Sequence, residues 1–214
     1  HMGSGTTWYE GRLSELLVEN IPALDSVQIT NSGSEATSLA IRLARVHTGR
    51  NDVIVMQGGF NGSNNDLAYN VMNPLDAIGV RVSPGEYPRM PLSAGIPEGT
   101  AQHVHVINFN DLDSVRWVAE KYDIAALITE PILQNIGVVK PRPGYLQGLR
   151  ELADEFGIIK ETFAQASDAL GYDVWELVQQ DPNNQLNETQ FTQPALLTAS
   201  VALYRVAKDK GLGD

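Results

Sequence analysis

The sequence predicts an α/β protein with a mainly parallel sheet, followed by an all-helical C-terminal segment. Up to Gly157, short β-branched runs alternate with stretches of helical periodicity, the order of elements that builds a parallel sheet. After Gly157, three helical patterns follow one another without a strand between them. With 214 residues, 43% of them hydrophobic, the chain can bury one sizeable core or two small ones.

In the first part, helices and strands are predicted in turn. Apolar residues recur at helical spacing over 8–19, and Pro22 ends that helix. Another helix begins near Ser34. Strands are predicted at 26–33, 52–59, 79–83, 103–110 and 124–131, and the later helices at 112–121 and 144–156.

The helical patterns of the second part cover 158–170, 172–180 and 193–210. Pro194 suits a first helical turn, and Gly211 follows the last one. We expect Trp175, Leu196, Leu197, Leu203 and Tyr204 to form core. The predicted division is therefore a remnant of a cleaved expression tag at 1–5, an α/β part at 6–157 and a helical part at 158–214.

Composition excludes several classes of partner and site. The formal net charge is −11 and the basic residues are scattered, so a nucleic-acid partner is not expected. No apolar run approaches the ~18 to 20 residues that span a bilayer, so no membrane segment is predicted. The absence of cysteine excludes disulfides and thiolate zinc sites and fits a cytoplasmic location; no metal site is predicted.

The segment "ITNSGSEATSLAIRLAR" joins a predicted strand to a helix through a turn of small residues. This geometry presents unpaired backbone N–H groups and the positive end of a helix dipole to an anion. Ser32 and Ser34 add hydroxyl groups, and Gly33 allows close approach of the backbone. A simpler alternative is that Ser34 caps the helix, with Glu35 and Thr37 in its first turn.

Three segments together resemble the class III pyridoxal-phosphate aminotransferases, especially the glutamate-1-semialdehyde aminomutase branch. They are "NSGSEATSLAIRLARVHTGR", "GGFNGS" and "ALITEPILQNIGVVKPRPGYLQGLRELADEFG", and the similarity runs from about Thr6 to Gly157. The resemblance implies an incomplete aminotransferase large domain. It also implies pyridoxal phosphate as cofactor, held at the residues Ser32, Gly33, Ser34, Phe60, Glu130 and Asn135.

Within that implied site, the first three residues hold the phosphate, Phe60 stacks on the pyridine ring, and Glu130 and Asn135 line the pocket. The family's usual Tyr-His-Gly-His has become Phe60-Asn61-Gly62-Ser63, which keeps an aromatic face and loses a phenol and two imidazoles. The family also needs an aspartate against the pyridine nitrogen and a Schiff-base lysine, both expected beyond Gly157 and neither present in the sequence.

The lysines of this sequence do not fill that role. Lys121, Lys140, Lys160, Lys208 and Lys210 are all predicted to be solvated residues at helix ends or in loops. We therefore assign no catalytic residue and expect no transaminase activity from the chain alone. Pyridoxal phosphate would bind without its Schiff-base lysine, and the favoured expectation is that none is bound.

The second part, about Ile158 to Val206, resembles malonyl-CoA:acyl carrier protein transacylase. That family's serine elbow and histidine do not occur here. We expect a catalytically incomplete, artificially recombined chimera of two fragments, which retains affinity for phosphate at Ser32 to Ser34.

Two alternatives stay open. One is an aminotransferase fragment completed by another chain. The other is a folding unit that forms a homo-oligomer through apolar faces or open sheet edges, because the aminotransferase strands lost beyond Gly157 lie between those retained.

Overall fold

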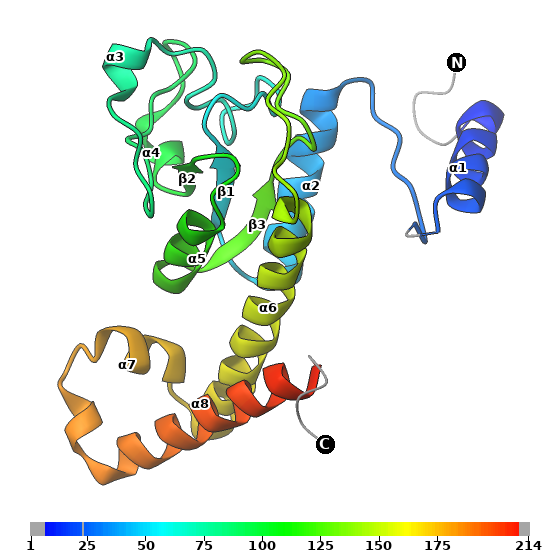
Figure 1. Cartoon of the computed structure of the whole chain (residues 1–214). Helices are drawn as coiled ribbons and strands as arrows, with labels where there is room; N and C mark the ends of the chain where they lie inside the picture. The colour runs from blue at the N-terminus through cyan, green and yellow to red at the C-terminus, as the bar shows by residue number, and fades with distance from the viewer. Residues whose placement is uncertain (1–6, 23, 210–214) are drawn as a thin grey trace.

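The computed structural model of the chain describes residues 7–22 and 24–209 (Figure 1). The proposed tag remnant at 1–5 lies outside the described residues. An α/β body and a helical arm are joined by one long helix, and the first helix stands apart from the body (Figure 1). The elements are α1 Trp8–Asn20, α2 Gly33–Thr48, β1 Asp52–Met56, α3 Leu75–Ile78, α4 Glu98–Ala101, β2 Val104–Ile107, α5 Leu112–Lys121, β3 Ile124–Ile128, α6 Tyr145–Leu170, α7 Val174–Gln180, the 3-10 helix η1 Gln185–Asn187 and α8 Thr189–Asp209.

The sheet is small and entirely parallel, with the strand order β2-β1-β3. Val53 pairs with Val104 on one side and with Ala126 on the other. The α/β class, the parallel pairing and these three strands are confirmed. Strand β1 is almost fully buried and β2 is fully buried although it lies at an edge of the sheet, whereas every residue of the other edge strand, β3, is half-buried.

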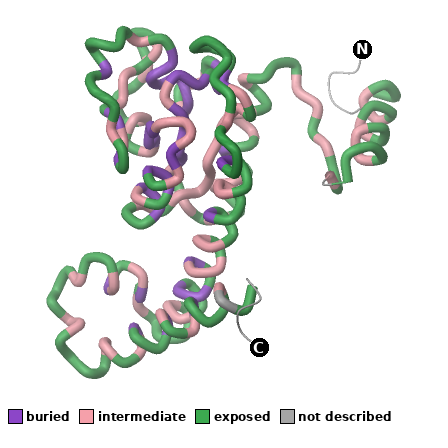
Figure 2. Tube along the Cα trace, viewed as in Figure 1, coloured by how far each residue is buried: buried purple, intermediate pink, exposed green. Residues whose placement is uncertain are grey.

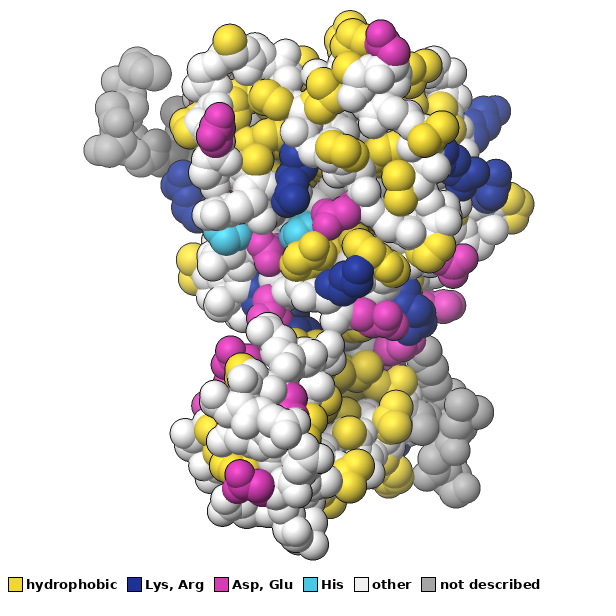
Figure 3. Space-filling view, turned by 90° about the vertical axis from the view of Figure 1, so that its left-hand side faces the viewer, with side chains coloured by type: hydrophobic (Ala, Val, Ile, Leu, Met, Phe, Trp, Pro, Cys, Tyr) yellow, Lys and Arg dark blue, Asp and Glu magenta, His cyan; other side chains and the backbone are white. Residues whose placement is uncertain are grey.

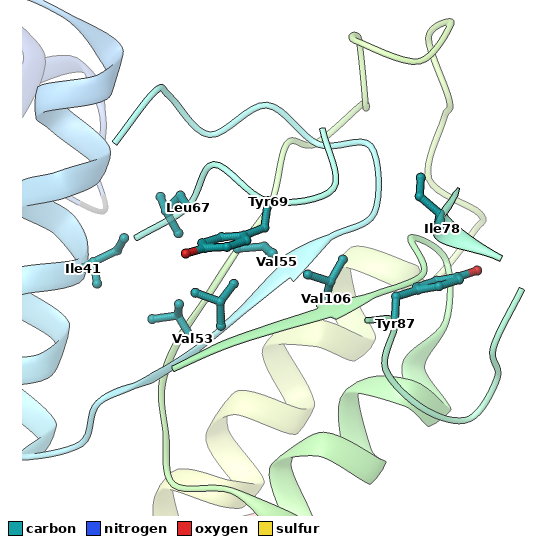
Figure 4. Close-up of a cluster of buried hydrophobic side chains, with 9 residues drawn as sticks. Ile41, Val53, Val55, Leu67, Tyr69, Ile78, Tyr87 and Val106 are labelled. Atoms are coloured by element: carbon teal, nitrogen blue, oxygen red, sulfur yellow. The ribbon is translucent and has the colours of Figure 1, made fainter. Parts of the chain in front are cut away.

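One face of the sheet is covered by α2 and by the long loops that follow β1. Val53 and Val55 of β1 point to this face, as residues two apart on a strand must. They pack with Leu67 and Tyr69 from the loop and with Ile41 from α2 (Figure 4). This cluster fixes the start of α2 and the loop after β1 on the same side of the molecule.

The opposite face of the sheet is covered by α5 and the first half of α6. Ile54 and Met56 of β1 point there and pack with Val115 and Val118 of α5 and Leu152 of α6. Asp111 caps α5 by accepting a hydrogen bond from the Ser114 N–H at 3.1 Å, and the helix has its predicted bounds. The two faces together form the core of the α/β body, which is the most buried region in Figure 2.

Two predicted strands are absent from the described residues. Neither 26–33 nor 79–83 forms a strand, and β2 and β3 have no further strand beside them. An isolated extended segment gains no ladder hydrogen bonds, so β-branched composition alone does not make it a strand. The two β-branched runs therefore remain irregular connections.

The change of pattern at Gly157 is not a break in the backbone. Helix α6 continues through Gly157 to Leu170, so the helices predicted at 144–156 and 158–170 are one element of 26 residues. The remaining helical patterns form α7 and α8. Helix α8 starts at Thr189, which places Pro194 inside the helix and not in its first turn as predicted. Gly211 lies outside the described residues.

The helical arm has its own small core, and its composition differs from the prediction. Phe163 and Trp175 do pack together, edge to face at 5.0 Å between ring centroids. From α8, however, Ala195 and Ala202 supply the buried surface. The other four predicted core residues are 57 to 66% exposed: Leu196, Leu197, Leu203 and Tyr204. Small side chains let α8 lie close against α6, and the large side chains therefore remain outside the contact.

The surface carries charges of both signs. On the face shown in Figure 3, Lys and Arg side chains are interspersed with Asp and Glu, and hydrophobic side chains gather on both the body and the arm. Among the described residues, no helix has the length and apolar character that crossing a membrane requires.

Candidate functional site

The candidate site begins at the N-terminus of α2. Ser32 is extended, with φ −152° and ψ 158°, and its side chain accepts a hydrogen bond from the Glu35 N–H at 3.2 Å. The Glu35 carboxylate in turn accepts from the Asn31 N–H at 2.8 Å. A capping arrangement is therefore present, centred on Ser32 and not on Ser34. This cap uses the Glu35 N–H group. The N–H groups of Gly33 and Ser34, at the exposed start of the helix, have no described partner.

The loop after β1 is held against this helix start. Gly62 has φ +97°, and a Cβ at this position would lie 2.8 Å from the Ser34 Cα. The Ser34 Oγ accepts a hydrogen bond from the Ser63 N–H at 3.1 Å, and Thr37 donates its hydroxyl to the Asn61 carbonyl at 2.8 Å. Only glycine fits both the backbone angle and the close approach, so the loop and the helix form one unit.

The same loop is joined to the end of β3. The Phe60 N–H donates to Glu130 Oε1 at 3.1 Å, and the other oxygen of Glu130 accepts from the Gln134 N–H at 3.2 Å. Phe60 is 48% exposed, so part of this residue remains accessible to a ligand. The carboxyl ends of β1 and β3 meet at this edge of the parallel sheet, the usual place for a ligand site in such folds.

Asn135 is placed less directly. It is exposed, and its side-chain amide donates to the Val71 carbonyl at 3.2 Å. The bond fastens the loop after β3 to the loop after β1. Within the described hydrogen bonds, Asn135 therefore supports the loop that carries Phe60 and makes no bond to Phe60 or Glu130 themselves.

The sequence reasoning missed several residues beside this helix start. A hollow of about 450 Å³ runs along α2 and is lined by Ser34, Ser38, Arg42 and Ser63 among others. Residues four apart on a helix share a face, so the spacing of Ser34, Ser38 and Arg42 was a signal that could have found them. From the sequence, Ser63 is only the replacement for an imidazole, whereas in the structure its N–H donates a hydrogen bond to the Ser34 Oγ.

The prediction that every lysine is solvated is wrong for Lys160. Its side chain is 7% exposed, pairs with Asp123 and lies 3.6 Å from the centroid of the Trp175 ring. Burial lowers the pKa of Lys160, and the neighbouring Asp123 opposes that shift. Asp123 precedes β3, so this amine lies at the opposite end of that strand from Glu130.

The other described lysines are no better placed. The Lys121 amine lies 3.2 Å from the centroid of the Trp117 ring at the end of α5, Lys140 is exposed, and Lys208 is on α8. Lys210 lies outside the described residues. Among the described residues, no group of histidine, aspartate and glutamate side chains has the arrangement of a metal site.

Comparison with known proteins identifies the family of the α/β part. The model of the aminotransferase class-III family matches residues 5–159. Glutamate-1-semialdehyde 2,1-aminomutase 2 of Anoxybacillus flavithermus is 39% identical over 155 residues, which cover 72% of this chain and 34% of that protein. The corresponding protein of Geobacillus kaustophilus has the same identity and coverage.

Solved structures show the same relationship. The crystal structure of an omega-transaminase from Sphaerobacter thermophilus matches with a TM-score of 0.64 and 31% identity, over 72% of this chain and 35% of that one. A glutamate-1-semialdehyde-aminomutase from Pseudomonas aeruginosa PAO1 matches with a TM-score of 0.58 and 26% identity, over 72% and 31%. The chain spans about a third of the length of the curated relatives that it matches. Because the family model matches more than half of its residues, the chain belongs to the class-III aminotransferase family.

Proposed function

We propose that the start of α2 and the loop Phe60–Ser63 bind the phosphate of pyridoxal phosphate, and that the chain does not complete amino-group transfer by itself. The observation that carries the proposal is the packing of Gly62 on Ser34, which places a loop backbone and a helix N-terminus around one exposed point. One solved relative is described as a transaminase with PLP bound, so the cofactor is plausible for the family.

The donor set suits a phosphate dianion. Gly33 and Ser34 offer backbone N–H groups at the positive end of a 16-residue helix. The hydroxyl groups of Ser34 and Ser63, 3.5 Å apart, can turn toward the same anion. These groups are fixed by the cap at Ser32 and by the Gly62 contact, so little reorganisation accompanies binding.

The pyridine ring of the cofactor would contact fewer side chains of this chain than the phosphate would. Bound pyridoxal phosphate supplies an electron sink for chemistry at an amino-bearing carbon. Phe60 offers an aromatic face for the ring, and Glu130 holds the Phe60 backbone in place. The described lysines lie elsewhere, so this chain's residues bind and orient without moving the substrate proton. A second chain that supplies the lysine is the alternative.

We further propose that residues 158–214 are a transacylase-like segment joined to the aminotransferase-like part, as in a chimera. Its support is the sequence resemblance over Ile158 to Val206, together with a separate core around Phe163, Val174, Ala195 and Ala202. The family model ends at residue 159, close to the proposed join. Hydrogen exchange in increasing urea tests whether the segment 158–214 unfolds separately from the α/β body. The amides of α8 should lose protection before those of β1, whereas simultaneous loss would indicate one cooperative unit.

The binding proposal is tested by titrating the chain with pyridoxal phosphate and following the quenching of its tryptophan fluorescence. Inorganic phosphate should compete. Ser34→Ala should weaken binding by about tenfold, because it removes one hydrogen bond to a charged group worth about 1.5 kcal/mol. Ser200→Ala, which removes an exposed hydroxyl on α8, is the control and should bind as the parent does.

Failure of phosphate to compete, or unchanged binding by Ser34→Ala, would contradict the phosphate site. A second readout addresses catalysis. Borohydride reduction followed by peptide mass spectrometry should find no single lysine modified in high yield. A lysine modified stoichiometrically, together with turnover, would contradict the claim of an incomplete chain. Turnover only on addition of another chain would favour the alternative.

A further inference from the structure

We propose that a second cavity, at the carboxyl end of β2, binds a small zwitterion such as an α-amino acid. Its carboxylate would lie at the start of α6 beside two arginines, and its ammonium group at the buried carboxylate of Asp111. The cavity has a volume of about 410 Å³, within the ordinary range for small-molecule sites. Its residues are separate from those proposed for the phosphate, so neither proposal depends on the other.

The anion-binding half is formed by the start of α6 and two guanidinium groups. Gly144 precedes the helix in the left-handed region, with φ +82°, and no side chain caps the helix. The Tyr145 N–H donates to the Arg142 carbonyl at 3.0 Å, whereas the N–H groups of Leu146 and Gln147 have no described partner. These two groups and the dipole of a 26-residue helix favour a negative group there. Arg81 and Arg142 line the same cavity. The backbone of Arg142 is fixed by a hydrogen bond of 2.7 Å from its N–H to the Asn110 side-chain oxygen.

The cation-binding half is a carboxylate oxygen that lacks a donor. The Asp111 side chain is 4% exposed and also lines the cavity. Its Oδ1 accepts the hydrogen bond that caps α5, whereas its Oδ2 is buried and accepts no hydrogen bond of normal geometry. The Arg81 guanidinium is 3.9 Å from Oδ2, too far for a hydrogen bond, and the Ser83 hydroxyl is the other polar group nearby. A buried carboxylate oxygen normally has a donor, and a ligand in the cavity can supply it.

The charges of the cavity identify the class of ligand. Two arginines face two aspartates, Asp111 and Asp113, so the formal charges cancel while remaining separated in space. A simple anion would meet the buried Asp111 carboxylate, and a simple cation would meet the guanidinium groups. A molecule with a carboxylate and an ammonium group on the same carbon satisfies both halves.

The proposal can be tested by an NMR titration of the full chain, in which the amide signals of Asn110 and Gly144 are followed. The probes are L-alanine and its two halves, propanoate and ethylamine. L-alanine should shift both signals saturably and bind at least about tenfold more tightly than either half, since two charge-assisted contacts act together. Arg142→Gln and Asp111→Asn should each weaken binding by about tenfold.

Asn is a good N-cap, so Asp111→Asn keeps the cap of α5 and changes the free oxygen. Arg142 is exposed, so its replacement leaves the core intact if the aspartate variant fails to fold. Controls are Arg150→Gln and Asp168→Asn, two exposed residues of α6 outside the cavity. Propanoate binding as tightly as L-alanine would overturn the proposal, as would the absence of shifts at Gly144 or unchanged binding by Arg142→Gln.

Discussion

Gly62→Ala is predicted to separate the loop after β1 from the start of α2. Gly62 has φ +97°, an angle that costs an L-residue about 1 to 2 kcal/mol. The added Cβ would also lie 2.8 Å from both the Cα and the Oγ of Ser34. Because the Cα belongs to the helix backbone it cannot rotate away, and overpacking of this kind costs about 1 to 3 kcal/mol more. The total loss of unfolding free energy is then about 2 to 5 kcal/mol.

Gly95→Ala provides a matched control. Gly95 has φ +91°, close to that of Gly62, but a Cβ there would have nothing within 4 Å. The Gly95→Ala variant should lose only the part of the unfolding free energy that comes from the backbone angle, about 1 to 2 kcal/mol. Urea unfolding followed by circular dichroism measures both losses, and the difference between the two variants isolates the steric contact with Ser34. If Gly62→Ala were no more destabilising than Gly95→Ala, the loop would not be packed on the helix start, and the reasoning behind the phosphate site would be refuted.

Three further predictions concern the body and the arm. Burial raises the pKa of Tyr145 to about 12. Because the pKa of the folded state lies above that of the unfolded state, the free energy of unfolding is unchanged below about pH 10. It then falls by about 2 kcal/mol as the pH rises toward 12. The free energy of unfolding of Tyr145→Phe should fall less over that pH range. Parallel curves of this free energy against pH for the two proteins would contradict the raised pKa of Tyr145. Phe163→Ala, at a position 4% exposed, should cost about 3 to 5 kcal/mol by urea unfolding, and retention of parental stability would remove Phe163 from the arm's core. Leu197→Ala, at a position 66% exposed, should change the stability of the monomer by less than about 0.5 kcal/mol; a larger loss that depends on protein concentration would show that a second copy covers this face.

The strands that the sequence identified correctly are the ones with partners. The runs at 52–56, 104–107 and 124–128 are mostly apolar, and the last two each pair with the first, so local pattern and tertiary context agree. The run at 26–33 contains the β-branched residues Val27, Ile29 and Thr30 among polar residues, and it has no adjacent strand. Composition does not reveal whether a neighbouring strand exists, and this is why one β-branched run forms a strand and another does not.

The core of the arm could not be inferred from hydrophobicity alone. Leu196 and Leu203 are seven apart and define an apolar stripe, yet helix α8 lies on α6 through Ala195 and Ala202. Close approach of two helices rewards small residues, and the large side chains then point outward. Likewise Lys160 looked solvated because a single lysine in a helix usually is, whereas the long helix α6 brings it between Asp123 and Trp175.

The candidate site was predicted in part. The small-residue turn indicated a helix start at Ser32 to Ser34, and α2 begins there, whereas the strand predicted before the turn does not form. Anion binding at this helix start stays a prediction. The bonds from Ser63 to Ser34 and from Phe60 to Glu130 join residues 29 and 70 positions apart, and no local pattern encodes such distances. The second bond follows from the parallel sheet, which places the ends of β1 and β3 side by side, and the first follows from the packing of α2 against the loop after β1.

The central claim is that the start of α2 binds the phosphate group of the cofactor. An NMR titration that compares pyridoxal phosphate with pyridoxal tests it most directly, because the two molecules differ only in that group. The amide signals of Gly33 and Ser34 should shift saturably with pyridoxal phosphate and with inorganic phosphate, and stay in place with pyridoxal. Equal shifts with pyridoxal, or no shift at Gly33 and Ser34 with any of the three, would contradict the claim.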